Sequence, residues 1–146
     1  MDKKAEITLT PGLEDYLEAI YNIEQEKNVS RVKDIATMLD VRAASVTGAL
    51  QSLSEKQLIN YTPYEYITLT DLGKAEAIKI VRRHKLLKRF FIDILGIEEA
   101  IADVGACNVE HNMPRPIMER MADFMDFMEK SGRFELIEDF KHTNHS

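Results

Sequence analysis

Hydrophobic residues recur at helical spacing along most of the chain. Apolar residues at positions 13, 17, 20 and 21 define one buried stripe, and Pro11 suits the first turn because its missing N–H needs no partner there. Similar stripes predict helices over 35–39, 46–53, 71–94, 98–104, 118–128 and 134–140, with a further helical stretch through Cys107 ended by Pro114 and Pro116. The chain is therefore expected to be mainly α.

Two features near residue 40 and residue 65 break this helical pattern. The helices over 35–39 and 46–53 are joined by the short link Asp40-Val41-Arg42, which is typical of a helix-turn-helix or of a plain helical hairpin. Residues 61–70 are β-branched and aromatic, alternate over 66–69, and contain a turn at Pro63-Tyr64, so they predict a β-wing. This order predicts a winged helix-turn-helix DNA-binding domain over residues 1–72 and a helical domain over 73–146.

The second helix of this motif offers candidate DNA contacts. Small and hydroxyl-bearing residues at its start would let it approach the floor of a DNA groove. The expected contacts on the recognition helix are Arg42, Ser45, Thr47 and Gln51, and the expected phosphate contacts are Arg31 and Lys56.

Charge and cysteine content narrow the classes of function. The net charge of −6 argues against nucleic-acid binding over most of the protein surface. DNA contact therefore needs a local basic patch or bound cations that cancel acidic charge. One cysteine excludes an internal disulfide and fits a reducing compartment. Without an apolar N-terminal segment or a run of membrane-spanning length, the chain is expected to be cytoplasmic, with no membrane partner.

The five residues from Cys107 to His111 carry three different metal-binding groups. On a helix, Cys107, Glu110 and His111 would stand at i, i+3 and i+4 and share a face. A thiol, a carboxylate and an imidazole together suit a divalent transition metal. The plainer interpretation is a buried Cys107 beside solvated Glu110 and His111.

Other candidate side chains have equally plain interpretations. Asp15 and Glu18 are typical of the solvated face of the first helix, and His84, on an apolar helix face, is typical of a hydrogen-bonded core histidine. The methionine-rich stripe over 118–128 predicts either core or a dimer seam.

Taken together, six stretches resemble the DtxR/MntR family of metal-dependent transcriptional repressors, over about residues 13–127. They are LEDYLEAIY (13–21), RVKDIA (31–36), ASVT (44–47), LTDLG (69–73), RHKLL (83–87) and CNVEH (107–111). The resemblance implies a homodimeric regulator of manganese or iron homeostasis, in the short two-domain form, that binds a double-stranded DNA operator when divalent metal is bound between its domains.

The resemblance also implies a ligand set. Matched residue by residue, the metal ligands are Asp15, Glu18, His84, Cys107, Glu110 and His111. The iron-sensing branch has the cysteine at 107 and the manganese-sensing branch has the aspartate at 15, so the set is mixed and implies Mn²⁺ or Fe²⁺, with Co²⁺, Ni²⁺, Zn²⁺ or Cd²⁺ able to substitute. Lys88 and Asp103 stand where the iron branch has a glutamate and a histidine of a second site.

Two other functions fit parts of the pattern. A winged-helix regulator could sense an oxidant or a small ligand through Cys107, and a metallohydrolase could use the same donors with an open coordination position. No general base or oxyanion donor stands apart from the proposed ligands, so the chain is not expected to be an enzyme or to take a small organic substrate.

Overall fold

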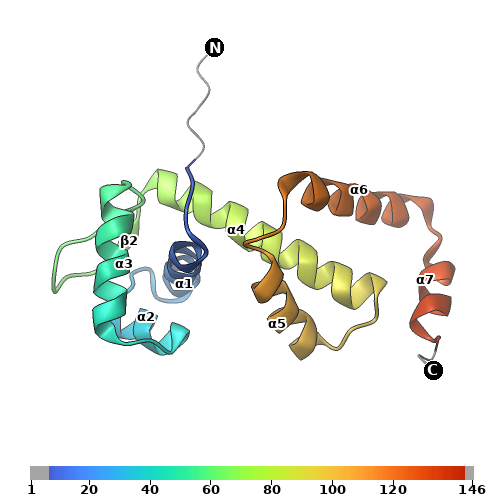
Figure 1. The fold of residues 1–146 in the computed structure, drawn as a ribbon, viewed down its shortest axis with the longest axis horizontal. Helices are drawn as coiled ribbons and strands as arrows, with labels where there is room; N and C mark the ends of the chain where they lie inside the picture. Colours follow the sequence, from blue (N-terminus) through green and yellow to red (C-terminus); the bar gives the residue numbers. More distant parts are fainter. Residues whose placement is uncertain (1–6, 144–146) are drawn as a thin grey trace, which may run out of the picture. The chain divides into compact units, whose positions relative to one another are not determined.

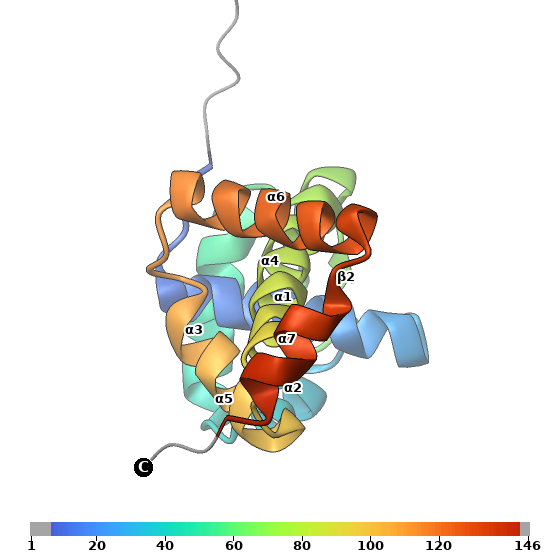
Figure 2. The same ribbon diagram turned by 90° about the vertical axis from the view of Figure 1, so that its right-hand side faces the viewer.

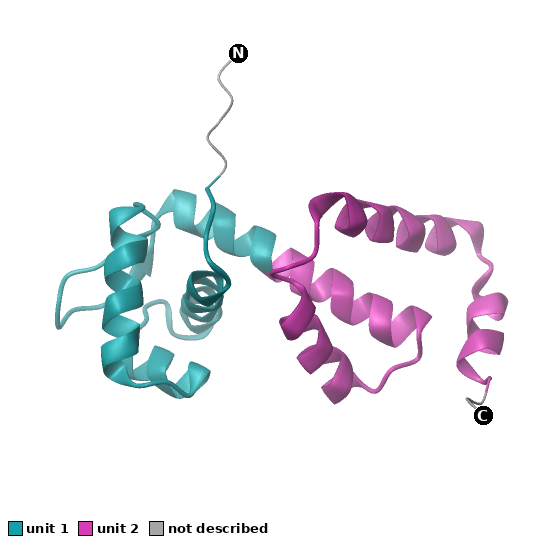
Figure 3. Cartoon of the chain, in the orientation of Figure 1, with its two compact units in different colours: residues 1–80 teal, residues 81–146 magenta. Residues whose placement is uncertain are grey.

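The computed structural model describes residues 7–143. It divides into two compact units, Met1–Ile80 and Val81–Ser146 (Figure 3). The division falls inside the helix that begins at Asp71. The predicted domain boundary between residues 72 and 73 stays a prediction.

Three helices form most of unit 1: α1 (Pro11–Lys27), α2 (Val32–Leu39) and α3 (Ala43–Glu55) (Figure 1). The hydroxyl of Thr10 accepts a hydrogen bond from the Leu13 N–H at 3.2 Å, which caps α1 where the sequence predicts its start. The predicted stripe faces the core, whose fully buried side chains include Leu17, Ile20, Ile35, Val46, Leu50 and Leu53.

The turn between α2 and α3 is tight. Asp40 adopts a left-handed conformation (φ 53°), and the N–H of Val41 donates to the carbonyl of Ala36 at 3.1 Å. Val41 itself is exposed, so the turn is closed by backbone hydrogen bonds and not by packing of its apolar residue. The helix-turn-helix interpretation of this segment fits this geometry.

The wing is a two-stranded antiparallel sheet, with β1 (Ile59–Asn60) pairing β2 (Thr68–Leu69). Its strands are shorter than the predicted hairpin over 61–70, and β1 begins before that segment because Ile59 pairs with Leu69 in the core. The predicted alternation holds: Ile67 and Leu69 are buried, whereas Tyr66 is exposed. An isolated bridge between Ser30 and Ile67 ties the wing to the segment before α2.

Helix α4 (Asp71–Arg89) starts directly after the wing. The hydroxyl of Thr70 accepts from the Gly73 N–H at 3.0 Å and donates to the Gln57 carbonyl at 2.7 Å, so Thr70 caps α4 at the start of the predicted 71–94 helix. A Cβ atom at Gly73 would lie 1.8 Å from the carbonyl oxygen of Leu58, so only glycine permits this approach. The start of α4 therefore packs on the backbone that follows α3.

Unit 2 contains the end of α4, the π-helical turn η1 (Phe90–Ile94), α5 (Glu99–Val109), α6 (Arg115–Ser131) and α7 (Phe134–Lys141). Figures 1 and 2 show the second half of α4 between α5 and α6, where Leu87, Ala106 and Met118 form the buried cluster. Two expectations are wrong in detail. The last residues of the predicted 71–94 helix form a π-helical turn, and the 98–104 helix is continuous with the stretch through Cys107.

The observed fold is mainly helical with one small sheet, as predicted from the sequence. Across residues 7–143, no helix combines the length and the apolar character that crossing a membrane requires.

Candidate metal centre and nucleic-acid interface

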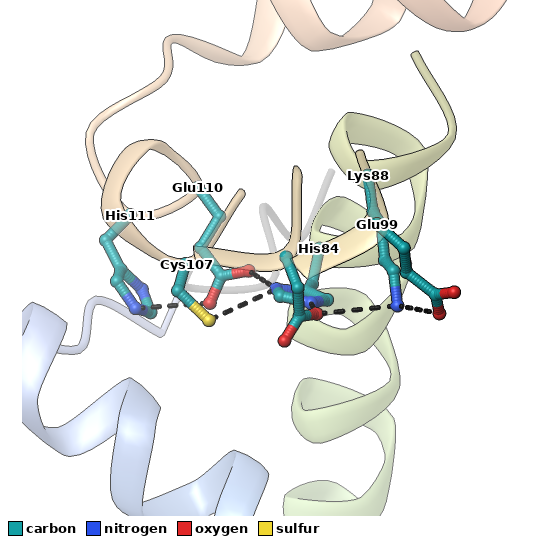
Figure 4. Close-up of polar contacts among 7 residues, drawn as sticks. His84, Lys88, Glu99, Cys107, Glu110 and His111 are labelled. Carbon is teal, nitrogen blue, oxygen red and sulfur yellow. Dashed lines mark hydrogen bonds and ion pairs between the residues drawn. The ribbon is translucent and has the colours of Figure 1, made fainter. Parts of the chain in front are cut away.

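Four of the predicted ligands gather in unit 2 (Figure 4). His84 projects from α4, and its Nδ1 lies 2.8 Å from Oε2 of Glu110 and 3.7 Å from the Sγ of Cys107. The other carboxylate oxygen of Glu110, Oε1, lies 3.2 Å from Nε2 of His111. Two imidazole nitrogens therefore lie against one carboxylate, and a thiol sulfur lies against one of the two imidazoles.

The end of α5 sets the positions of these donors. The helix ends at Val109, earlier than the expected stop at Pro114, but Glu110 keeps helical backbone angles and its N–H donates to the Ala106 carbonyl at 3.0 Å. Cys107 and Glu110 thus share a face at i, i+3. His111 lies in the turn that follows and reaches Glu110 from there.

Glu110 is a carboxylate buried in the protein, which marks it as a candidate metal ligand. Its side chain is 1% exposed, and within residues 7–143 its Oε1 is buried without a hydrogen bond of good geometry, although Nε2 of His111 lies nearby. A buried carboxylate is costly unless a cation or donors compensate its charge. Cys107 is exposed, contrary to the plainer interpretation of a buried apolar residue. This donor set fits a divalent transition metal.

The far side of the His84 ring carries a second polar group. Nε2 of His84 lies 2.8 Å from Oδ1 of Asp103, and the Lys88 ammonium lies 3.6 Å from the same oxygen and 3.2 Å from Oε1 of Glu99. The hydrogen bond with His84 lowers the pKa of the Asp103 carboxyl below its usual value. The hydrogen bond with Glu99, supported by the charge of Asp103, raises the pKa of Lys88.

The contact of Asp103 with His84 was not predicted from the sequence. The signal was present: Lys88 follows His84 by four residues, and Asp103 follows Glu99 and precedes Cys107 by four. Residues four apart share a helix face. The sequence alone does not show that these two faces meet.

Asp15 and Glu18 lie three residues apart on α1 in unit 1, so they are on neighbouring positions of one helix face. Asp15 is exposed and Glu18 is half-buried. Their assignment as metal ligands stays a prediction.

The predicted DNA contacts lie on the surface of unit 1. All six side chains are exposed: Arg31, Arg42, Ser45, Thr47, Gln51 and Lys56. Thr47 and Gln51 line an open groove with Gly48, together with Tyr61 and Pro63 of the wing loop. The hydroxyl of Thr47 is directed at the carbonyl oxygens of Ala43 and Ala44, at 3.0 and 2.9 Å, so its hydrogen is used within α3 while its oxygen can still accept a hydrogen bond.

Arg31 is docked against the wing, a contact that the sequence does not reveal. Its guanidinium donates to the hydroxyl of Tyr66 at 2.9 Å and lies 4.8 Å from the centre of that ring. The charge is therefore held in place beside the wing while the residue stays exposed.

Comparison with known protein families divides the chain into two matching parts. Residues 8–67 match the N-terminal DNA-binding domain of the iron-dependent repressors, and residues 70–138 match their metal-binding and dimerisation domain. Both matches include the segments described above, with the exposed groove in the first and the donors of α4 and α5 in the second.

Individual relatives agree with these matches. An uncharacterized helix-turn-helix-type transcriptional regulator of Methanocaldococcus jannaschii is 37% identical over 119 residues, covering 81% of this chain and 95% of the relative. The regulator MntR of Bacillus pumilus is 36% identical over 122 residues, covering 84% of each chain.

A solved manganese-dependent transcriptional repressor in complex with manganese is 28% identical with a TM-score of 0.73. The match covers 79% of this chain and 53% of that chain, so this chain spans about half the length of the solved repressor. The two domain matches and these relatives show that the chain belongs to the DtxR/MntR family of metal-dependent transcriptional repressors.

Proposed function

We propose that this chain is a metal-dependent repressor whose homodimer binds a DNA operator in the cytoplasm when Mn²⁺ or Fe²⁺ occupies a site formed by both units. The proposed ligands are Asp15, Glu18, His84, Cys107, Glu110 and His111. The observation that carries the proposal is the buried carboxylate of Glu110 held between His84 and His111, inside the segment that matches a metal-binding domain.

The chemistry of the donors supports a transition metal. Imidazole nitrogen and thiolate sulfur favour later and softer ions, whereas carboxylate oxygen favours Mn²⁺. Cys107 supplies a soft sulfur donor and Glu110 a hard oxygen donor, from the same face at the end of α5. The mixed set therefore suits ions between manganese and zinc better than Mg²⁺ or Ca²⁺.

The proposed mechanism starts from charge. Asp15 and Glu18 belong to unit 1 and Glu110 to unit 2, and like charges that converge repel one another. When bound, a divalent ion supplies the positive charge that removes this repulsion. Ligands from both units then hold the DNA-binding unit in one arrangement, which selects a fixed spacing of the two α3 helices in the dimer. Metal and operator should promote each other's binding, by about 1–3 kcal/mol for a typical coupling.

The DNA-binding role rests on the exposed face of α3 and on the wing. The side chains proposed to contact base edges or phosphates are those of Arg42, Ser45, Thr47 and Gln51. Arg31 and Lys56 would contact phosphates. Because the chain has a net charge of −6, bound cations would also reduce its general repulsion from DNA.

The proposal is tested by selecting duplexes from a random pool with Mn²⁺-loaded protein and measuring their affinity across a Mn²⁺ titration. Glu18→Ala and His111→Ala should remain folded dimers but need at least roughly tenfold more metal for half-maximal binding, because each loses a ligand. Matched controls are Glu26→Ala, at an exposed acidic residue on the same helix as Glu18, and His142→Ala, at an exposed histidine.

This function would be refuted if the affinity for the duplex did not change with metal concentration. It would also be refuted if both ligand variants needed no more metal than the wild type. The parallel titration with Fe²⁺, Co²⁺ and Zn²⁺ then ranks the ions that the site accepts.

One observation favours the alternative of an oxidant sensor: the Cys107 thiol is exposed. An oxidant sensor would keep its DNA binding in a chelator and lose it in peroxide, with Cys107→Ser insensitive to peroxide. The proposed metal sensor loses DNA binding in the chelator. The family is one of transcriptional repressors and not of enzymes, so no hydrolase role is proposed.

A further inference from the structure

The ring of His84 is bracketed by two carboxylates, one at each nitrogen. Nδ1 faces Glu110 at 2.8 Å (Figure 4). Nε2 faces Asp103 at 2.8 Å. A neutral imidazole has one N–H and one lone pair, so it can donate to only one of these carboxylates while the other nitrogen acts as a ligand. The neighbours of each nitrogen decide which one carries the hydrogen.

The two sides of the ring differ in the groups that surround them. On the Nδ1 side lie further metal-binding donors, the Sγ of Cys107 at 3.7 Å and the buried carboxylate of Glu110. On the Nε2 side, Asp103 already has a cation, because the Lys88 ammonium lies 3.6 Å from the same Oδ1 that meets the ring. The charge of Asp103 is thus balanced within the protein, whereas the Nδ1 side gathers donors for a cation.

We propose that Asp103 is a positioning residue that holds the Nε2–H of His84 and thereby reserves Nδ1 for the metal, with Lys88 anchoring Asp103. This inference rests on the proposed function, in which His84 is a ligand. A carboxylate that accepts the second N–H of a metal-bound histidine fixes its tautomer and ring orientation, and losing such a partner costs about 10–100-fold in metal affinity.

The side chains of this network form two pairs, one on α4 and one on α5. His84 and Lys88 are one turn apart on α4, and Glu99 and Asp103 are one turn apart on α5. Lys88 bridges both acids of α5, at 3.2 Å to Glu99 and 3.6 Å to Asp103. Glu99 touches the ammonium and not the imidazole, so it offers a control that alters the same network without touching His84.

The test uses ¹¹³Cd²⁺ bound to the chain of residues 1–146 with ¹⁵N-labelled histidine. Coupling between ¹¹³Cd and ¹⁵N identifies the ligating nitrogen, and His84→Gln assigns the signals. We expect coupling to Nδ1 of His84 and a proton on Nε2. Asp103→Ala should lower Cd²⁺ and Mn²⁺ affinity, measured by calorimetry, by about 10–100-fold. Asp103→Asn, which keeps an oxygen acceptor, should lose less, and Glu99→Gln should bind as the wild type does.

The side chain of Asp103 is 51% exposed, so these variants should keep the fold, and circular dichroism of the metal-free protein checks this. Coupling to Nε2, or wild-type affinity in Asp103→Ala, would overturn the positioning role while leaving His84 a ligand. The absence of coupling to either nitrogen of His84 in the wild type would instead overturn the ligand assignment in the proposed function, and this inference with it.

Discussion

Cys107 is the residue from which we expect the candidate metal centre to take its preference among ions. It is exposed, lies 3.7 Å from Nδ1 of His84, and shares a face of α5 with the buried Glu110. A thiolate favours soft ions and a carboxylate favours hard ones. The sequence predicted the donors at 107, 110 and 111 because they are close in the chain, but it did not predict that Glu110 is buried or that Asp103 meets His84. Both of these depend on how α4 and α5 pack.

Replacing Cys107 with glutamate tests this preference. We expect Cys107→Glu to bind Mn²⁺ at least as well as the wild type and to lose affinity for Cd²⁺, so that the ratio of the two affinities shifts by roughly tenfold or more, or about 1.4 kcal/mol. Competition calorimetry with both ions measures the ratio. Cys107→Ser is the control for loss of the thiol alone. An unchanged ratio in both variants would exclude Cys107 from the ligands.

At the scale of elements, the sequence predicted where α1 and α4 begin, whereas α2, α3 and α6 each begin three residues before the predicted ranges. Thr10 and Thr70 cap α1 and α4, and a cap depends on only a few neighbouring residues. The π-helical turn η1 and the end of α5 at Val109 were not predicted, since nothing in their local composition marks them. Each wing strand has two residues, and in the pair Ile59 and Leu69 both side chains are buried.

A substitution at Gly48 tests whether α3 approaches DNA closely. It lies within the helix and lines the groove beside Thr47 and Gln51, and a Cβ there would meet nothing within 4 Å in the protein. Gly48→Ala should therefore raise the free energy of unfolding by about 0.5–1 kcal/mol. It should weaken binding to the selected duplex by roughly tenfold, because the added methyl group would stand between α3 and the DNA in the proposed complex.

Denaturant unfolding and fluorescence anisotropy measure the two effects of Gly48→Ala. Gly12→Ala is the matched control, because a Cβ at Gly12 also meets nothing within 4 Å but Gly12 lies outside the groove. Wild-type DNA affinity in Gly48→Ala would show that this face of α3 does not approach DNA closely.

A substitution at Gly73 tests the packing of the start of α4 on the backbone at Leu58. A Cβ there would overlap the Leu58 carbonyl, so Gly73→Ala must shift the backbone and should lower the free energy of unfolding by about 1–3 kcal/mol. Thermal unfolding compared with that of Gly12→Ala measures the loss. A Gly73→Ala chain as stable as the wild type would mean that α4 starts farther from Leu58 than described.

At the scale of the whole molecule, unit 2 exposes apolar side chains on several helices. The methionines at 118, 125 and 128 are buried, whereas Phe124 of the same stripe is exposed, as are other apolar residues of α5, α6 and α7. Ile101 and Val104 are 62% and 61% exposed and stand at i, i+3 on α5. Such surface is typical of a protein interface. The sequence alone left core and dimer seam as alternatives for the methionine stripe.

Charging this surface should separate the homodimer. With both Ile101→Lys and Val104→Lys in the chain, we expect the dimer dissociation constant to rise by roughly a hundredfold or more, since each buried side chain contributes about 1.5–3 kcal/mol. Sedimentation velocity gives the constant, and Met38→Lys, at an exposed apolar residue of α2, is the control. An unchanged dimer would assign the interface to other helices.

We propose that one ion is held by side chains of both units. The most direct measurement is a crystal structure of the Mn²⁺-loaded chain, with the ion located by its anomalous scattering. We expect Asp15 and Glu18 in the coordination shell together with His84 and Glu110. Manganese bound by unit 2 alone, with both α1 carboxylates directed into solvent, would contradict it.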